Sequence, residues 1–65
     1  MFRIEVERSD GSKFFRGGSA PKEWRNPEDA DAVAEGLWRR FGDREEYVCF
    51  SVIEQDGTVY SEWEV

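Results

Sequence analysis

Two Asp-Gly dipeptides, Asp10-Gly11 and Asp56-Gly57, most constrain what this chain can fold into. Each lies between runs that suit β-strands, and Asp-Gly in that setting is the strongest short-range signal for a β-hairpin. Residues 2–8 alternate apolar and charged side chains, which is the period of a strand with one buried face. Residues 45–55 are rich in β-formers, and residues 58–65 alternate apolar and polar side chains. The sequence therefore predicts one hairpin at each end of the chain.

A two-residue turn at each Asp-Gly would set which residues face each other. In the first hairpin we expect Val6 opposite Phe15, so that Phe15 joins the core and Phe14 lies among charged residues on the other face. In the second hairpin we expect Phe50 opposite Trp63. The same register places Val52 opposite Ser61 and Val48 opposite Val65.

The segment between the hairpins has the signals of one helix over residues 27–41. Asn26 is a good N-cap, Pro27 suits the first helical position, and Gly42 is expected to end the helix in the left-handed conformation. Apolar residues recur at helical spacing, and Gly36 inside the helix hints at close packing. The combined patterns predict a core of Phe2, Ile4, Val6, Phe15, Val33, Ala34, Leu37, Phe41, Val48, Phe50, Val52 and Trp63.

These elements predict a single α+β domain over residues 1–65, with the plan β-β-α-β-β and one helix on one face of a four-stranded antiparallel sheet. We expect the strand order 2-1-3-4, because it makes all neighbours antiparallel and places the long apolar third strand inside. The order 1-2-4-3 is the alternative. The plan resembles the architecture of small bacterial and phage proteins, without a diagnostic family motif.

The residues that could carry catalysis are few. The chain has no histidine and one cysteine, Cys49, which lies in a predicted strand and suits a half-buried structural role. We therefore expect no enzyme activity, no cofactor and no metal site. The segment Gly17-Gly18-Ser19 could form an anion-binding nest, but a flexible strand exit is the simpler interpretation.

Charge is unevenly distributed in this acidic chain, whose net charge is −6. Residues 1–25 carry six basic and four acidic side chains, whereas residues 26–65 carry three basic and eleven acidic ones. An acidic balance argues against nonspecific nucleic-acid binding. Basic and aromatic residues do interleave near the start of the chain, at Arg3, Arg8, Lys13, Phe14, Arg16, Lys22, Trp24 and Arg25. No apolar run reaches bilayer length, so we expect no membrane association and a cytoplasmic location; the initial Met1 favours a complete small protein.

One helix can cover only one face of a four-stranded sheet. By the expected registers, the other face shows a candidate interaction surface of Phe14, Tyr47, Ile53 and Tyr60. The sequence therefore predicts a non-catalytic protein-interaction module, for which we favour self-association as a homodimer through the open sheet face or a sheet edge over binding of another protein partner. The alternatives are an acidic inhibitor that mimics nucleic acid and, less favoured, a nucleic-acid binder that uses the basic first hairpin.

Overall fold

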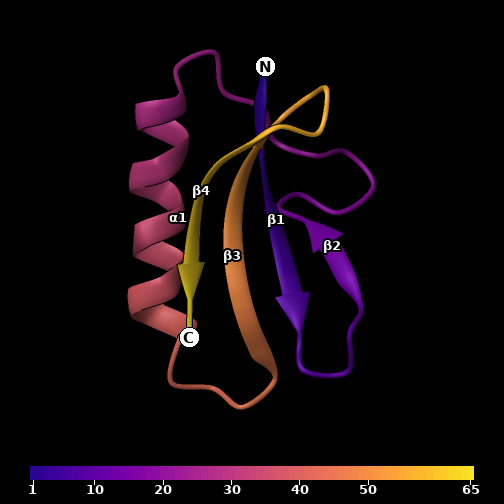
Figure 1. The fold of residues 1–65 in the computed structure, drawn as a ribbon, viewed down its shortest axis with the longest axis vertical. Helices are drawn as coiled ribbons and strands as arrows, with labels where there is room; N and C mark the ends of the chain where they lie inside the picture. Colours follow the sequence, from indigo (N-terminus) through magenta and orange to yellow (C-terminus); the bar gives the residue numbers. More distant parts are fainter.

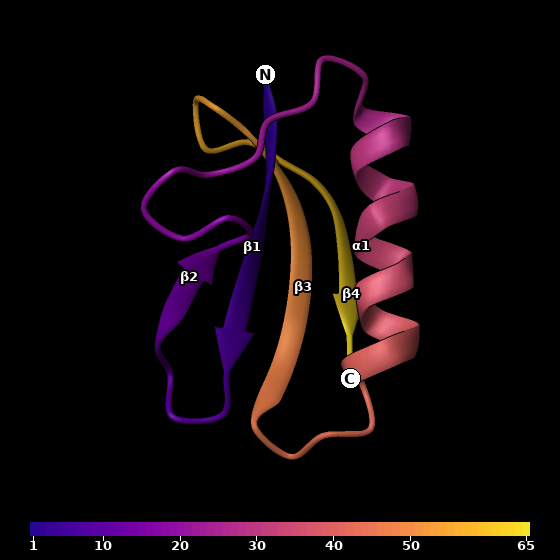
Figure 2. The same ribbon diagram turned by 180° about the vertical axis from the view of Figure 1, so that it is seen from behind.

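The computed structural model describes residues 1–65 as one α+β unit with a helix on one side of a sheet (Figures 1 and 2). Its elements are β1 (Phe2–Arg8), β2 (Lys13–Phe15), α1 (Pro27–Phe41), β3 (Tyr47–Glu54) and β4 (Val59–Glu64). The four strands form an antiparallel sheet in the order β2-β1-β3-β4, which confirms the predicted fold and strand order. The single helix is too short and too polar to cross a bilayer.

At the two ends of α1, the predicted N-cap is confirmed and the predicted left-handed end is not. Asn26 caps the helix as predicted, because its side-chain oxygen accepts a hydrogen bond from the Glu28 N–H at 2.9 Å. Gly42, however, has φ −66° and is right-handed, so the expected left-handed end is wrong. Its N–H donates to the Trp38 carbonyl, and an added Cβ would overlap that carbonyl oxygen. The exposed Gly36 has no atom within 4 Å of such a Cβ, so it does not mark close packing.

Both hairpin loops contain three residues rather than two. In the first loop the Arg8 N–H donates to the Ser12 carbonyl at 2.8 Å, which leaves residues 9–11 between the paired positions. In the second loop the Glu54 N–H donates to the Thr58 carbonyl at 2.7 Å. A two-residue type I′ turn needs positive φ at both central positions. In these two loops only the glycines, Gly11 (+89°) and Gly57 (+95°), have a positive φ. Each loop therefore shifts its hairpin by one residue.

In the first hairpin this shift exchanges the faces of two phenylalanines. The structure pairs Val6 with Phe14 and Glu5 with Phe15. Because successive strand residues point to opposite faces, a slip of one residue moves every side chain of β2 to the other side. Phe14 therefore packs against the core and Phe15 lies on the helix-free face, the reverse of the prediction.

In the second hairpin a β-bulge cancels the same shift. Ile53 pairs with Val59 and Val52 pairs with Ser61, so Tyr60 is an extra residue in β4. Beyond this bulge the register is the predicted one, and Phe50 pairs with Trp63. A bulge inserts one unpaired residue into one strand, which is what the longer loop requires here.

A second bulge lies where β3 begins. Glu7 pairs with Cys49 and Arg8 pairs with Tyr47, so Val48 has no partner on β1. Tyr47 consequently packs against the core, whereas Val48 is 40% exposed and lies outside the core, so its predicted core position is wrong.

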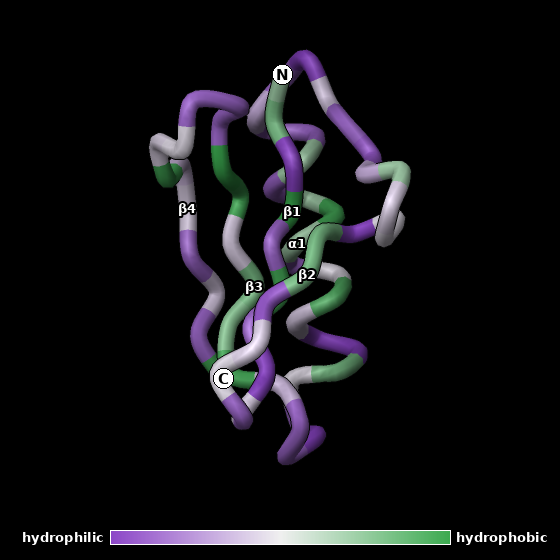
Figure 3. The backbone as a smooth tube through the Cα atoms, turned by 90° about the vertical axis from the view of Figure 1, so that its right-hand side faces the viewer, coloured by the Kyte–Doolittle hydropathy of each residue, from purple (hydrophilic) through white to green (hydrophobic).

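The core lies between the sheet and α1. Hydrophobic and hydrophilic residues alternate along β1, as Figure 3 shows, and the hydrophobic ones face the helix. The fully enclosed cluster consists of Ile4, Val6, Ala30, Ala34, Phe50 and Val52. Large side chains pack around it while remaining partly exposed, among them Phe2, Phe14, Trp24, Val33, Leu37, Trp38, Phe41, Tyr47 and Trp63.

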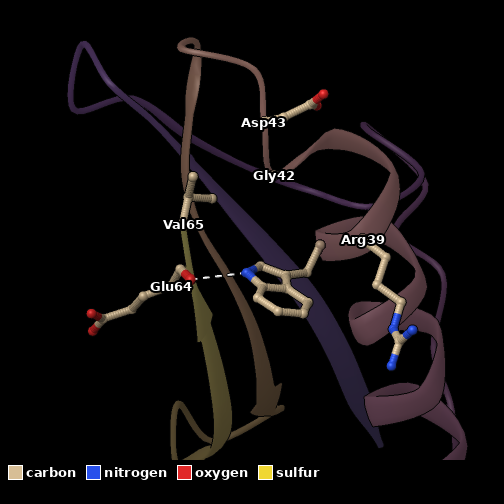
Figure 4. A pocket seen from close by; sticks show the side chains of 6 residues that line it. Arg39, Gly42, Asp43, Glu64 and Val65 are labelled. Carbon is tan, nitrogen blue, oxygen red and sulfur yellow. Dashed lines mark hydrogen bonds between the residues drawn. The ribbon is translucent and has the colours of Figure 1, made fainter.

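Two side-chain hydrogen-bonding clusters fasten α1 to the edge strand β4. The Asp31 Oδ1 accepts hydrogen bonds from the Ser61 hydroxyl at 2.6 Å and from the Trp63 indole N–H at 2.8 Å. Near the other end of the helix, the Trp38 indole N–H donates to the Glu64 carbonyl at 2.9 Å (Figure 4). These contacts hold the helix over the β4 side of the sheet. The strand β2 at the opposite edge is therefore left without contacts to the helix.

Candidate binding groove

The structure does not bring together the four residues of the predicted interaction surface. Phe14 and Tyr47 pack against the core on the helix side, whereas Ile53 is half-buried at a position of the helix-free face. Tyr60 lies in the β4 bulge, 49% exposed, with its ring packed edge-on against Phe2. The expectation that the four share the helix-free face is therefore wrong, because both hairpin loops and the β3 bulge change the register on which it depended.

The helix-free face of the sheet is mainly polar and charged. The ammonium group of Lys13 lies 3.9 Å from the Glu5 carboxylate and forms an ion pair with it. The Arg3 guanidinium lies 5.6 Å from the centre of the Phe15 ring and its Nε is 3.5 Å from Glu23. The apolar Phe15 is thus flanked by charge.

An apolar groove lies instead on the helix side. Because α1 packs against β3, β4 and β1, it does not reach β2 at the far edge of the sheet (Figures 1 and 2). A hollow of about 150 Å³ remains between the C-terminal half of α1 and β2. Its lining consists of Val6, Phe14, Arg16, Leu37, Phe41, Tyr47 and Phe50, and only Arg16 among them is charged. We call this site the α1–β2 groove.

Arginines surround the α1–β2 groove. The Arg8 guanidinium lies 4.4 Å from the centre of the Phe14 ring. On the helix side, the guanidinium of Arg44 lies 5.0 Å and that of Arg40 lies 6.0 Å from the centre of the Phe41 ring. Contacts of this kind combine a cation–π attraction with packing of the arginine stem. The rim is therefore basic in a protein whose net charge is −6.

The sequence had indicated part of this site. Within the basic and aromatic cluster predicted near the start of the chain, the structure brings Arg8, Phe14 and Arg16 together at the groove. Trp24 lies elsewhere, because its backbone N–H and C=O pair with Phe2 and extend the edge beside β1. Arg40 and Arg44 were missed as rim residues. Their place depends on where the end of α1 lies in space, which no local pattern encodes.

The loop between β2 and α1 is closed on itself. The Lys22 N–H donates to the Arg16 carbonyl at 2.9 Å, and the Gly18 N–H donates to the Phe15 carbonyl at 2.8 Å. A Cβ on Gly17 would lie 2.6 Å from the Ala20 carbonyl oxygen, so glycine is needed there. Because the Gly18 N–H donates within the loop, this amide of the Gly17-Gly18-Ser19 segment is not free to bind an anion.

A wider hollow lies at the same, C-terminal end of the helix but on its other side, beside β4 (Figure 4). It has a volume of about 340 Å³ and is lined by Trp38, Arg39, Gly42, Asp43, Glu64 and Val65. The Trp38 indole N–H is engaged by the Glu64 carbonyl, and Arg39 pairs with Glu35 at 2.7 Å. Its principal donors therefore have partners within the fold, which favours a structural role.

The groove has the chemistry of a binding surface: an apolar floor, aromatic walls and a rim of guanidinium groups. No group of three His, Cys, Asp or Glu side chains is placed to hold a metal ion. The free thiol of Cys49 is buried, with its Sγ 3.4 Å from the Ser51 hydroxyl. Comparisons of the chain with models of known families, with curated proteins and with solved structures find no match.

Proposed function

We propose that the protein is a non-catalytic interaction module that binds a segment of a partner protein in the α1–β2 groove. The observation that carries this proposal is the uncovered apolar lining between α1 and β2, in which Phe14, Leu37 and Phe41 remain only partly buried. Partly exposed apolar side chains gathered in a concave site, with a polar rim, are typical of protein-recognition surfaces. A cytoplasmic location belongs to the same proposal, and the single unpaired cysteine supports it.

The helix-free face supports a second candidate, an acidic inhibitor that mimics nucleic acid. Glu5 on β1 and Glu62 on β4 both pair with Ser51, and Glu7 and Glu64 both pair with Cys49. The pairings set two carboxylates of β1 and two of β4 on either side of the central strand. Lys13 lies beside Glu5 and reduces the negative charge of this surface, so we favour the groove.

A random dodecamer peptide library displayed on phage tests the first proposal. We expect the immobilised protein to enrich peptides that bind wild type and the control variant Ile53→Gln alike, and that bind Phe14→Gln at least about tenfold more weakly, because Phe14 walls the groove. Circular dichroism shows whether each variant is folded at the assay temperature.

Amide chemical shifts of the wild-type protein give the same answer without a substitution, should Phe14→Gln fail to fold. Binding in the groove would shift the amides of Val6, Phe14, Leu37 and Phe41. The proposal is wrong if no peptide is enriched over an unrelated protein, or if bound peptides shift only the helix-free face. Enrichment of basic peptides whose binding is lost in Glu62→Gln would favour the acidic mimic instead.

A further inference from the structure

We infer that the α1–β2 groove recognises an acidic peptide segment, in which one apolar side chain enters the hollow and neighbouring carboxylates bind the arginines at its rim. The inference rests on the proposed function and specifies the chemistry of its partner. It follows from the unpaired arginines around the groove, from the arginines that lie over its aromatic rings, and from the size of the hollow.

Most arginines of the rim have no acidic partner within the protein. Arg8, Arg16 and Arg40 have no carboxylate within 4 Å, and Arg44 has only Glu46 at 3.8 Å. The chain contains fifteen acidic residues, enough to pair every cation. The other unpaired cations, Lys22 and Arg25, lie in the exposed loop before α1. Unneutralised positive charge is therefore concentrated at the groove, and such a patch favours and steers a partner of opposite charge.

Two of the rim arginines also lie over aromatic rings. Arg8 stacks on Phe14, and Arg44 lies over Phe41. A guanidinium that rests on an aromatic ring keeps its N–H edge free for a two-pronged hydrogen bond to a carboxylate. Because the stacking restricts the arginine before the partner arrives, less side-chain entropy is lost on binding.

The hollow suits one apolar side chain. Its volume of about 150 Å³ is below the roughly 300–1,000 Å³ of sites that enclose small-molecule ligands. Its floor contains Val6, Leu37 and Phe50, which offer no hydrogen-bonding side chain to a polar group. A single aliphatic or aromatic anchor flanked by acidic residues therefore fits both the floor and the rim.

The same aromatic rings are poorly placed for nucleic acid. Single strands bind by stacking bases on open ring faces. Here arginines lie over Phe14 and Phe41, and the Tyr47 ring is tilted against Phe41 and Phe50 at centroid distances of 6.1 and 5.7 Å. The net charge of −6 adds a general repulsion of phosphates.

A second copy of the chain fits the groove less well than a separate acidic peptide. A symmetric contact between two grooves would set arginines against arginines, because a two-fold interface uses the same patch on both subunits. A contact between the groove and the acidic β4 edge of another copy would be head-to-tail. It would leave one groove and one β4 edge unoccupied, so that further copies would add and form an open filament rather than a closed dimer.

Peptides enriched from the dodecamer library provide the test. We expect them to carry an excess of Asp and Glu around one apolar position. For a synthetic copy of one such peptide, Arg16→Gln and Arg40→Gln should each weaken binding about threefold to tenfold. The matched control Arg25→Gln removes an unpaired cation outside the groove and should leave the affinity unchanged. Raising the salt concentration from 50 to 250 mM should weaken wild-type binding and affect the Arg16→Gln variant less.

The outcomes separate this inference from the function on which it rests. If no peptide is enriched, both are wrong. If the enriched peptides are neutral or basic, shift the groove amides and bind Arg16→Gln as tightly as wild type, the groove is a protein-binding site of another kind and the acidic partner is refuted. A single-stranded oligonucleotide that shifts the groove amides at lower concentration than the peptides would refute it in favour of nucleic acid. Concentration-dependent dimerisation that shifts those amides would refute it in favour of a second copy.

Discussion

Asp31 joins α1 to β4 and should matter more to stability than its helical position suggests. Its Oδ1 accepts hydrogen bonds from Ser61 at 2.6 Å and from Trp63 at 2.8 Å. A hydrogen bond to a charged group contributes about 1.5–3 kcal/mol, and we take the lower value for each because both sites are only partly buried. Alanine recovers about 0.5 kcal/mol of helix propensity. Asp31→Ala should therefore lower the free energy of unfolding by about 2.5 kcal/mol, or the melting temperature by about 10–20 °C.

Asp29→Ala is the matched control for this measurement. Asp29 lies exposed in the first turn of the same helix, and its replacement by alanine brings the same gain in helix propensity as Asp31→Ala. It loses only a dipole interaction of about 0.3–1 kcal/mol, so its stability should change by less than about 0.5 kcal/mol. Urea denaturation followed by circular dichroism measures both variants. A double-mutant cycle with Trp63→Phe should give a coupling energy of about 1 kcal/mol with Asp31. Equal effects of Asp31→Ala and Asp29→Ala, with no coupling, would refute the reasoning.

Three further predictions follow from other parts of the fold. Gly36→Ala should raise the free energy of unfolding by about 0.5–1 kcal/mol, because the added methyl group meets open space in a helix interior; an unchanged or lower melting temperature would contradict this. Phe14→Lys should be much more destabilising than Phe15→Lys, because Phe14 packs against the core whereas Phe15 faces Glu5 across the sheet; a lower melting temperature for Phe15→Lys would argue for the two-residue turn. Hydrogen bonds from the Ser12 side chain and backbone lower the pKa of Asp10, and the Thr58 N–H lowers the pKa of Asp56. The stabilising contribution of these two carboxylates should be present above the ordinary aspartate pKa of about 4 and lost as pH falls through the lowered values. The melting temperature of the double variant Asp10→Asn/Asp56→Asn should therefore fall less on acidification than that of wild type.

The elements of this fold were predictable because their signals are local. The N-cap Asn26, the acidic first turn and the apolar stripe all lie within or beside the helix they specify, and α1 has the predicted bounds. The strand order followed from the same elements, because one arrangement makes every neighbouring pair antiparallel and buries the most apolar strand.

The register was not predictable from the same kind of signal. Asp-Gly suits a two-residue turn, but it suits equally well the end of a three-residue loop in which only the glycine has positive φ. The second hairpin kept its predicted core pairs only because Tyr60 bulges out and restores the alternation. The first hairpin has no such bulge on β2, so Phe14 and Phe15 exchanged faces.

The α1–β2 groove was hidden from the sequence for a related reason. It depends on Phe14 facing the helix side and on the β3 bulge that brings Tyr47 to the same side. It also depends on contacts from α1 to β4, such as the hydrogen bond from Trp38 to Glu64, that hold the helix away from β2. These are tertiary relations between residues far apart in the chain.

The most direct test of the central claim is a titration of ¹⁵N-labelled wild-type protein with an enriched acidic peptide, followed by amide chemical shifts. The groove account predicts the largest shifts at Val6, Phe14 and Phe41, with side-chain Nε–Hε signals of Arg16 and the other rim arginines moving in the same titration. Shifts concentrated at Ser51 and its neighbours on the helix-free face, with the groove amides unmoved, would contradict it.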